Sequence, residues 1–187
     1  MDDKYRRMVD FLVAEGTDKV AHTEKSFLAH LIGVYTDLEK WGCEPAVCRA
    51  GMFHSIYGTE PFQGFKLGLE RRGEVRTLIG EYAERLAYLN SAMTRTTFDE
   101  TIERDEGPHS MVDRFTGERV EFSPQEFQDL LTMHLCDWLE QVERYGKWDS
   151  RRVAFRRMAE MLSGVALESY DEVFSREPRV EATVSAG

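Results

Sequence analysis

The segment Phe27-Leu-Ala-His30-Leu-Ile-Gly-Val-Tyr35 is apolar with the period of an α-helix, and it carries one histidine where another aliphatic residue would fit the pattern. A second segment of this kind is Ala50-Gly-Met-Phe-His54-Ser-Ile-Tyr57. A third, Leu130-Leu-Thr-Met-His134-Leu-Cys-Asp137-Trp-Leu, adds a histidine and an aspartate to an apolar face. A polar group on a core-facing stripe is costly to bury unless another group pairs with it. We therefore expect these side chains to have polar partners in the folded protein.

His30, His54 and Asp137 lie on three separate helical segments. Imidazole and carboxylate groups that converge from separate helices are the usual protein ligands of a borderline or hard divalent metal. We therefore predict that the three side chains share one pocket and bind one divalent ion, with iron, manganese and zinc as the candidates. The rival interpretation is a pseudo-site in which the same groups hydrogen-bond one another or a bound small molecule.

The composition indicates a soluble globular protein. The 187 residues suffice for a single domain over 1–187 with a hydrophobic core, and 42% hydrophobic and 31% charged residues are ordinary values. A formal net charge of -10 argues against nucleic acid or an anionic membrane as the main partner, so an anionic substrate would need a local basic pocket. The N-terminus has no signal-peptide shape, no apolar run approaches membrane-spanning length, and the cysteines are odd in number. We therefore expect reduced thiols and a cytoplasmic location.

Apolar periodicity and end signals predict a mostly helical chain. Pro45 fits the first turn of one helix, and Gly42 suits the left-handed position that closes the helix before it. Residues 59–70 are predicted to form a loop beside the site, and the tail after Pro178 to be loose. The predicted helices span 2–15, 24–41, 45–57, 74–93, 124–145 and 150–174, the last one bent at Gly164.

Residues 94–122 interrupt the helical pattern. Within them, the segment 110–122 alternates apolar and polar residues around Thr116-Gly117, which predicts one small inserted β-hairpin. Ser123-Pro-Gln-Glu126 follows as a capping box with proline just inside, a strong signal for the start of a helix. The predicted fold class is all-α, a helical bundle with this one hairpin inserted late in the chain.

Taken in order, His30, His54 and Asp137 resemble the ligand skeleton of the HD superfamily, whose all-helical fold binds a metal through a His, a His-Asp pair and a distant Asp. The likeness is closest to the hydrolase domain that cleaves the stringent-response alarmones guanosine tetra- and pentaphosphate. It covers roughly residues 24–92 and 125–145, and it implies an HD-like helical bundle with a metal-dependent, phosphohydrolase-like activity.

The chain departs from that family at two places. Ser55 stands where the superfamily has the aspartate of its His-Asp pair, and Gly58-Thr59 stands where the alarmone hydrolases carry a catalytic Glu-Asp pair. The resemblance therefore extends to the fold and the metal and not to the named reaction. Two imidazoles and one carboxylate remain the ligand composition that non-haem iron(II) enzymes use with open positions, and it also suits manganese or zinc.

Other residues are candidates by position. Glu60 is the acid nearest to the displaced catalytic pair and is a candidate general base. His134 lies one helical turn before Asp137 and is a candidate base or further ligand, or else core filler. His22, two turns before His30, either faces the same cavity or lies on the surface. Arg71-Arg72 either clamps a phosphate or carboxylate at the cavity mouth or begins a solvated helix.

Ser55 and Tyr57 complete the predicted substrate-binding set, with Tyr57 either forming part of an apolar wall or only fixing the loop. Two classes of function follow. The first is a metal-dependent enzyme acting on a small anionic metabolite, with phosphate-ester hydrolysis favoured over oxidative iron chemistry. The second is a small-molecule binding protein that keeps the fold and the cavity without the metal.

Overall fold

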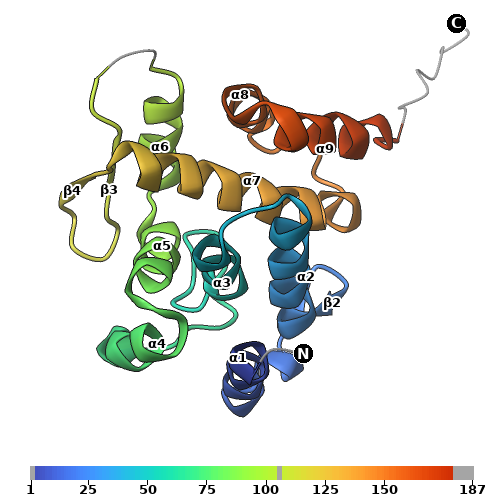
Figure 1. Ribbon diagram of the computed structural model, residues 1–187. Helices are drawn as coiled ribbons and strands as arrows, with labels where there is room; N and C mark the ends of the chain where they lie inside the picture. The colour runs from blue at the N-terminus through green and yellow to red at the C-terminus, as the bar shows by residue number, and fades with distance from the viewer. Residues whose placement is uncertain (1–2, 105–106, 179–187) are drawn as a thin grey trace, which may run out of the picture.

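The computed structural model describes residues 3–104 and 107–178, and most of them are helical (Figure 1). The predicted all-α class is confirmed, and the prediction of a loose tail lies largely outside the described residues. The helices are α1 (Asp3–Ala14), α2 (Phe27–Lys40), α3 (Pro45–Phe53), α4 (Arg72–Ile79), α5 (Glu81–Ala92), α6 (Arg95–Ile102), α7 (Pro124–Tyr145), α8 (Arg152–Leu162) and α9 (Gly164–Ser175), with 3-10 turns at Thr17–Lys19 and Leu69–Arg71. The strands are β1 (Ala21–His22), β2 (Lys25–Ser26), β3 (Ser110–Val112) and β4 (Arg119–Glu121).

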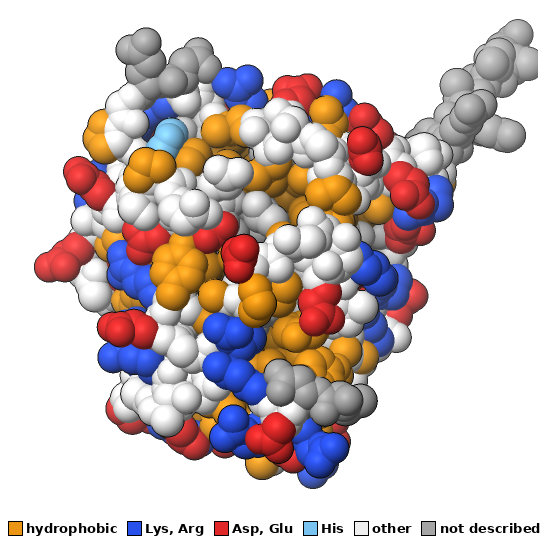
Figure 2. Space-filling view, viewed as in Figure 1, with side chains coloured by type: hydrophobic (Ala, Val, Ile, Leu, Met, Phe, Trp, Pro, Cys, Tyr) orange, Lys and Arg blue, Asp and Glu red, His pale blue; other side chains and the backbone are white. Residues whose placement is uncertain are grey.

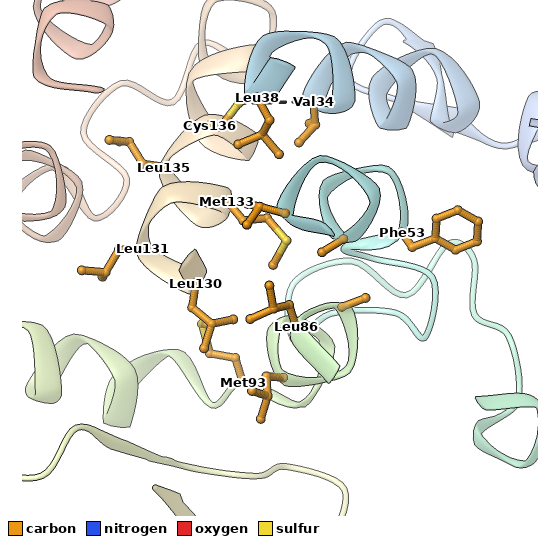
Figure 3. Packing of buried hydrophobic residues seen from close by; sticks show 14 of the residues in the cluster. Val34, Leu38, Phe53, Leu86, Met93, Leu130, Leu131, Met133, Leu135 and Cys136 are labelled. Atoms are coloured by element: carbon orange, nitrogen blue, oxygen red, sulfur yellow. Dashed lines mark hydrogen bonds between the residues drawn. The ribbon is translucent and has the colours of Figure 1, made fainter. Parts of the chain in front are cut away.

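Helix α7 is the central element. It packs against α2, α3 and α5 on one side and against α8 and α9 on the other (Figure 1). Leu130 and Met133 point toward α5 and α3, whereas Leu131 and Leu135 point to the opposite side (Figure 3). Because its apolar residues serve two layers, a long stretch of α7 is buried, and polar residues on it face other helices.

Local signals at the ends of α7 act as the sequence predicts. The Ser123 hydroxyl accepts a hydrogen bond from the Glu126 backbone N–H (3.2 Å), and the Glu126 carboxylate accepts one from the Ser123 N–H (2.9 Å). The predicted capping box is therefore confirmed. At the other end, Gly146 closes the helix with a φ of 67°, a conformation that glycine adopts without strain.

Helices α2 and α3 pack closely at Gly51, which has no side chain. A Cβ at this position would collide with Leu38 and lie 3.2 Å from Val34 Cγ1. This close approach brings the end of α3, where His54 stands, against the middle of α2, where His30 stands.

Three expectations about local structure are wrong. The helix predicted over 74–93 breaks at Gly80, whose φ of 98° and ψ of 155° lie outside helical geometry and turn α5 away from α4. The helix predicted over 45–57 ends at Phe53. Residues 94–122 contain α6, whose short apolar set gave too weak a periodic signal.

Both small hairpins are antiparallel. The predicted one is confirmed, with Met111 opposite Val120 and Gly117 in the turn at a φ of 76°. The second, β1–β2, was not predicted because its turn residues, Thr23 and Glu24, adopt positive φ values of 39° and 65° without glycine or asparagine.

In the described part of the chain, no helix combines the length and the apolar character needed to cross a membrane. Acidic and basic side chains intersperse over the face in Figure 2.

Candidate metal centre and adjoining cavity

His30, His54 and Asp137 meet in the interior, as the sequence predicts. All three are buried. Asp137 Oδ1 lies 3.1 Å from His30 Nε2 and 3.3 Å from His54 Nε2, and the two Nε2 atoms lie 3.3 Å apart. Gln141 Nε2 donates a hydrogen bond to the same carboxylate oxygen (2.8 Å). The group has the residue types and the mutual spacing of a metal-binding set.

The other nitrogen of each imidazole ring is already engaged. His30 Nδ1 donates to Glu140 Oε2 (2.5 Å), and His54 Nδ1 donates to the backbone carbonyl of Gly51 (2.7 Å). A carboxylate and a carbonyl only accept hydrogen bonds, so both Nδ1 atoms carry hydrogen. A neutral ring then directs the lone pair of its Nε2 atom toward Asp137. Partners of this kind on the outer ring nitrogen are typical of histidines that bind metals.

The site concentrates negative charge around the two rings. Burial lowers the pKa of His30, but hydrogen bonds to Asp137 and Glu140 outweigh burial and raise that pKa above its usual value. Burial likewise raises the pKa of Asp137, but the two histidines outweigh it and hold that pKa well below the usual range. The pocket therefore stabilises positive charge between the rings and the carboxylate.

Neighbouring elements hold these side chains in place. The backbone carbonyl of His54 accepts hydrogen bonds from Asn90 Nδ2 (2.9 Å) and Ser91 Oγ (3.2 Å), both on α5. Glu140 is paired with Lys25 and with Arg144 Nη2 (2.8 Å). A side chain at Gly33 would crowd the Glu140 carboxylate, since a Cβ there would lie 2.6 Å from Oε1.

A cavity of about 320 Å³ adjoins the centre, and His54 and Asp137 form part of its wall. It lies between the β1–β2 hairpin, the loop after α3, the start of α6 and the α7–α8 region. Aromatic side chains form another wall, where the rings of Trp138 and Phe155 stack with centroids 5.0 Å apart. The centre is therefore open to a small molecule on one side.

Three further predicted residues line this cavity: His22, Ser55 and His134. The His22 ring stacks on His30 with centroids 4.4 Å apart, and burial together with the neighbouring His30 lowers the pKa of His22 to about 4. His134 is buried, with Nδ1 3.2 Å from Asn90 Oδ1. Burial, then the adjacent Arg95 and Arg151, hold the pKa of His134 well below its usual value.

Four predicted residues do not line the cavity: Glu60, Tyr57, Arg71 and Arg72. Glu60 is exposed and accepts a hydrogen bond from the backbone N–H of Arg95 (3.0 Å). Arg71 pairs with Glu15 and Glu74. Arg72 and the Tyr57 hydroxyl both bind the buried Glu84, at 2.6 and 3.1 Å. The expected arginine clamp at the cavity mouth is therefore wrong in position.

The basic residues of the cavity are Arg95 and Arg151. Arg95 Nη1 lies 2.8 Å and Arg151 Nη1 2.6 Å from His134 Nε2. Sequence reasoning missed both, because Arg95 begins the helix that periodicity did not indicate and Arg151 stands in a left-handed turn, with φ 49°. Glu140 was also missed, although it lies on α7 one turn after Asp137 and this spacing could have indicated it.

Comparisons with known proteins give a family match without a known function. A family described as a domain of unknown function (DUF6817) matches residues 11–95. That range contains His30 and His54 and ends at Arg95, whereas Asp137 and Arg151 lie beyond it. No curated protein and no solved structure matches the chain. The geometry of the site is therefore the basis for inferring a function.

Proposed function

We propose that this protein is a metal-dependent enzyme with an HD-like fold, acting on a small anionic metabolite, with phosphate-ester hydrolysis as its reaction. His30, His54 and Asp137 would hold one divalent ion, iron, manganese or zinc. The observation that carries the proposal is the convergence of two Nε2 atoms on Asp137 Oδ1 while both Nδ1–H groups are engaged elsewhere.

The spacing of the three atoms fits a metal. With metal–ligand bonds of roughly 2.0–2.1 Å, two ligands at octahedral or tetrahedral angles are about 2.9–3.4 Å apart. The three separations between His30 Nε2, His54 Nε2 and Asp137 Oδ1 are 3.1, 3.3 and 3.3 Å. His54 and Asp137 also border the cavity, so coordination positions on that side are available to water or substrate.

Protons on the two Nε2 atoms would stabilise the Asp137 carboxylate less well than a metal ion would. For both contacts to Asp137 to be attractive, each Nε2 would have to carry hydrogen. Two imidazolium rings with nitrogens 3.3 Å apart repel each other. A divalent ion supplies the same charge at one point between the three atoms. This comparison favours a metal site over the pseudo-site in which the residues only hydrogen-bond one another.

When bound, such an ion supplies Lewis acidity that polarises a phosphoryl or acyl oxygen and activates water. The residues of the chain have separate tasks. Asp137 and the two histidines would hold the ion, and the aromatic wall at Trp138 and Phe155 would exclude bulk water from one side of the cavity. His134 remains neutral, and its Nε2 is an acceptor that can receive a proton once the arginines turn to the substrate.

One observation favours the second candidate, a binding protein without the metal. Asp137 is the only acidic residue among the described residues that line the cavity, and Ser55 offers a hydroxyl where HD enzymes have a carboxylate. An enzyme of this design has few acid–base groups besides His134. A binding protein would use the same cavity and would not need an ion.

Metal analysis separates the two candidates. The untagged protein is purified, and its iron, manganese and zinc are quantified by mass spectrometry beside Asp137→Asn, His54→Gln and the control Asp129→Asn, a partly exposed acid on the same helix that does not line the cavity. We expect near-stoichiometric metal in the wild type and in Asp129→Asn, and its loss in the other two. Metal-free protein that also fails to take up these ions on titration would overturn the proposal and leave the binding protein.

A further inference from the structure

We propose that Arg95 and Arg151, placed around His134, form the subsite that holds the phosphoryl group of a small phosphate monoester. This inference takes its reaction from the proposed function, but the binding itself requires no metal. It differs from the sequence-based expectation, which assigned the anion to Arg71 and Arg72.

The hydrogen-bond pattern around His134 brings the two arginines together at one atom. Asn90 Nδ2 donates to the His54 carbonyl, so Asn90 Oδ1 is the acceptor that faces His134 Nδ1. His134 therefore carries its hydrogen on Nδ1 and presents one lone pair on Nε2. Both Arg95 Nη1 and Arg151 Nη1 approach this single lone pair, at 2.8 and 2.6 Å. One acceptor cannot satisfy two guanidinium donors.

The charges around these arginines are unequal. Arg151 is paired with Asp99, through Nε at 2.8 Å and through Nη2. For Arg95, no carboxylate within the described residues comes within salt-bridge distance of the guanidinium. Burial and the neighbouring Arg151 lower the pKa of Arg95 to about 10. A partly buried cation beside a second cation is costly, and a bound anion removes that cost.

Unpaired hydrogen-bond donors also favour an anionic ligand in this cavity. Across the described residues, two buried side-chain nitrogens lack a partner, Arg95 Nε and Trp138 Nε1. Both belong to residues that line this cavity. Each is a donor and not an acceptor. The cavity therefore suits a ligand rich in acceptor oxygens.

The directions of the donors favour a phosphoryl group over a carboxylate. A carboxylate is bound best by one complete guanidinium fork in a plane. The Nε–Nη2 fork of Arg151 is occupied by Asp99, which leaves only Nη1 to the cavity, so a planar carboxylate on a fork of Arg95 would leave Arg151 without an anionic partner in the cavity. A phosphoryl group offers several oxygens in a tetrahedral arrangement, so it can accept from both residues at once.

The position also suits a single small substrate. His134 and Asp137 are three residues apart on α7, which corresponds to about 4.5 Å along the helix axis. A phosphoryl group at the arginines is therefore next to the candidate metal ligands. The stacked Trp138 and Phe155 rings provide an apolar surface for the rest of the molecule. A cavity of about 320 Å³ is at the small end of the range for ligand pockets.

Inorganic phosphate is the probe for this subsite. Its binding is measured by calorimetry in the presence of a metal chelator, for the wild type, Arg95→Gln, Arg151→Gln and the control Arg156→Gln, an exposed arginine paired with Glu160 and Asp171. We expect the wild type and Arg156→Gln to bind phosphate alike, and both cavity variants to bind it at least tenfold more weakly. Acetate should bind more weakly than phosphate. Equal phosphate affinity in Arg95→Gln and the wild type, or acetate binding as strong as phosphate binding, would overturn the inference.

A measurement on the unmutated protein covers the case in which a variant fails to fold. Phosphate should draw the arginines from His134 and shift the nitrogen resonance of its Nε2, and an unchanged resonance at saturating phosphate contradicts the inference. Asp137→Asn separates this inference from the proposed function. If that variant keeps its metal while phosphate binding still depends on Arg95, the metal site fails and the subsite stands. If metal is lost but no form binds phosphate, the subsite fails alone.

Discussion

Two buried carboxylates in this protein have opposite surroundings. Glu84, on α5, has no exposed surface and accepts hydrogen bonds from the Tyr57 hydroxyl (3.1 Å), from Arg72 Nε (2.6 Å) and Nη2 (3.1 Å), and from Arg76 Nη2 (3.4 Å). Asp137, on α7, faces two imidazole rings and the amide of Gln141.

The two carboxylates differ in whether the positive charge beside them is permanent. Arginine is always charged, so Glu84 has a fixed counter-ion, and it does not line the cavity. The charge on a histidine is conditional, and Asp137 borders the cavity. A carboxylate with permanently charged arginine partners is suited to holding helices together. A carboxylate beside histidines, which can release a proton and coordinate a metal ion instead, is suited to binding that ion. The surroundings therefore indicate a stabilising role for Glu84 and support the proposed metal-binding role of Asp137.

The largest effect should follow from breaking the first cluster. Glu84→Gln leaves the buried end of Arg72 without its counter-ion, and removing one partner of a buried pair costs about 3–5 kcal/mol. Asp137→Asn should cost less in the presence of chelator, because the two histidines can become neutral. Urea unfolding of both variants measures the two losses. A loss at Asp137 as large as the loss at Glu84 would remove the distinction between the clusters.

The second effect should appear only at Asp137. An ion that binds the folded protein stabilises it by about 2.7 kcal/mol when its concentration is 100 times the dissociation constant. Manganese or zinc should therefore raise the unfolding temperature of the wild type, and it should leave Asp137→Asn unchanged. Glu84→Gln, if it folds at low temperature, should show the same upward shift as the wild type. Equal metal-induced shifts in the wild type and Asp137→Asn would count against the assigned ligands.

The sequence predicts the Asp137 cluster better than the Glu84 cluster. Each ligand interrupts an apolar helical stripe, so a local pattern marks it, and the order of the three on the chain supports one shared pocket. Glu84 lies within a stretch predicted as one continuous helix. Its partner Arg72 is brought to it by the break at Gly80, and a local pattern does not encode such a contact. Hydrophobic periodicity thus indicates burial but not the identity of a distant partner.

The same limit applies to the cavity. The negative net charge predicts that an anion would need a local basic pocket, but the adjacent arginines that the sequence suggested for it, Arg71 and Arg72, do not line the cavity. Arg95 and Arg151 are 56 residues apart and meet only because α6 and α8 lie against each other. A turn with a positive φ at Arg151, which glycine usually marks, gave no signal in the sequence.

The third effect concerns pH, because two histidines that line the cavity, His22 and the buried His134, have lowered pKa values. The folded-state pKa values of His22, about 4, and of His134 lie below the unfolded value of 6.5. At these two groups the unfolded chain therefore takes up protons first, so the stability that their neutral forms contribute is present above pH 6.5 and falls as the pH drops toward 5. Each group contributes a slope of at most about 1.4 kcal/mol per pH unit.

His134→Gln should make that decline shallower. Urea unfolding of metal-free wild type and variant at pH 7.5, 6.5, 5.8 and 5.0 gives the two slopes. The contributions of Asp137 and Glu140, whose pKa values are lowered, and of His30, whose pKa is raised, are common to both proteins, so the difference between the two slopes isolates His134. Parallel slopes in the two proteins would mean that His134 takes up a proton in the folded state, contrary to its contacts with two arginines.

The smallest effect should come from Arg71, which belongs to neither cluster. Its guanidinium forms ion pairs with Glu15 and Glu74 at the protein surface, where solvent and salt screen the charges. Arg71→Gln should therefore leave the urea midpoint close to that of the wild type, and phosphate affinity should be unchanged. Arg72→Gln leaves the buried Glu84 carboxylate without this counter-ion, so it should clearly lower the urea midpoint, while phosphate still binds. Both variants change residues outside the cavity. Weaker phosphate binding in Arg71→Gln would therefore support Arg71 and Arg72 as the anion site, as the sequence suggests, and would count against Arg95 and Arg151.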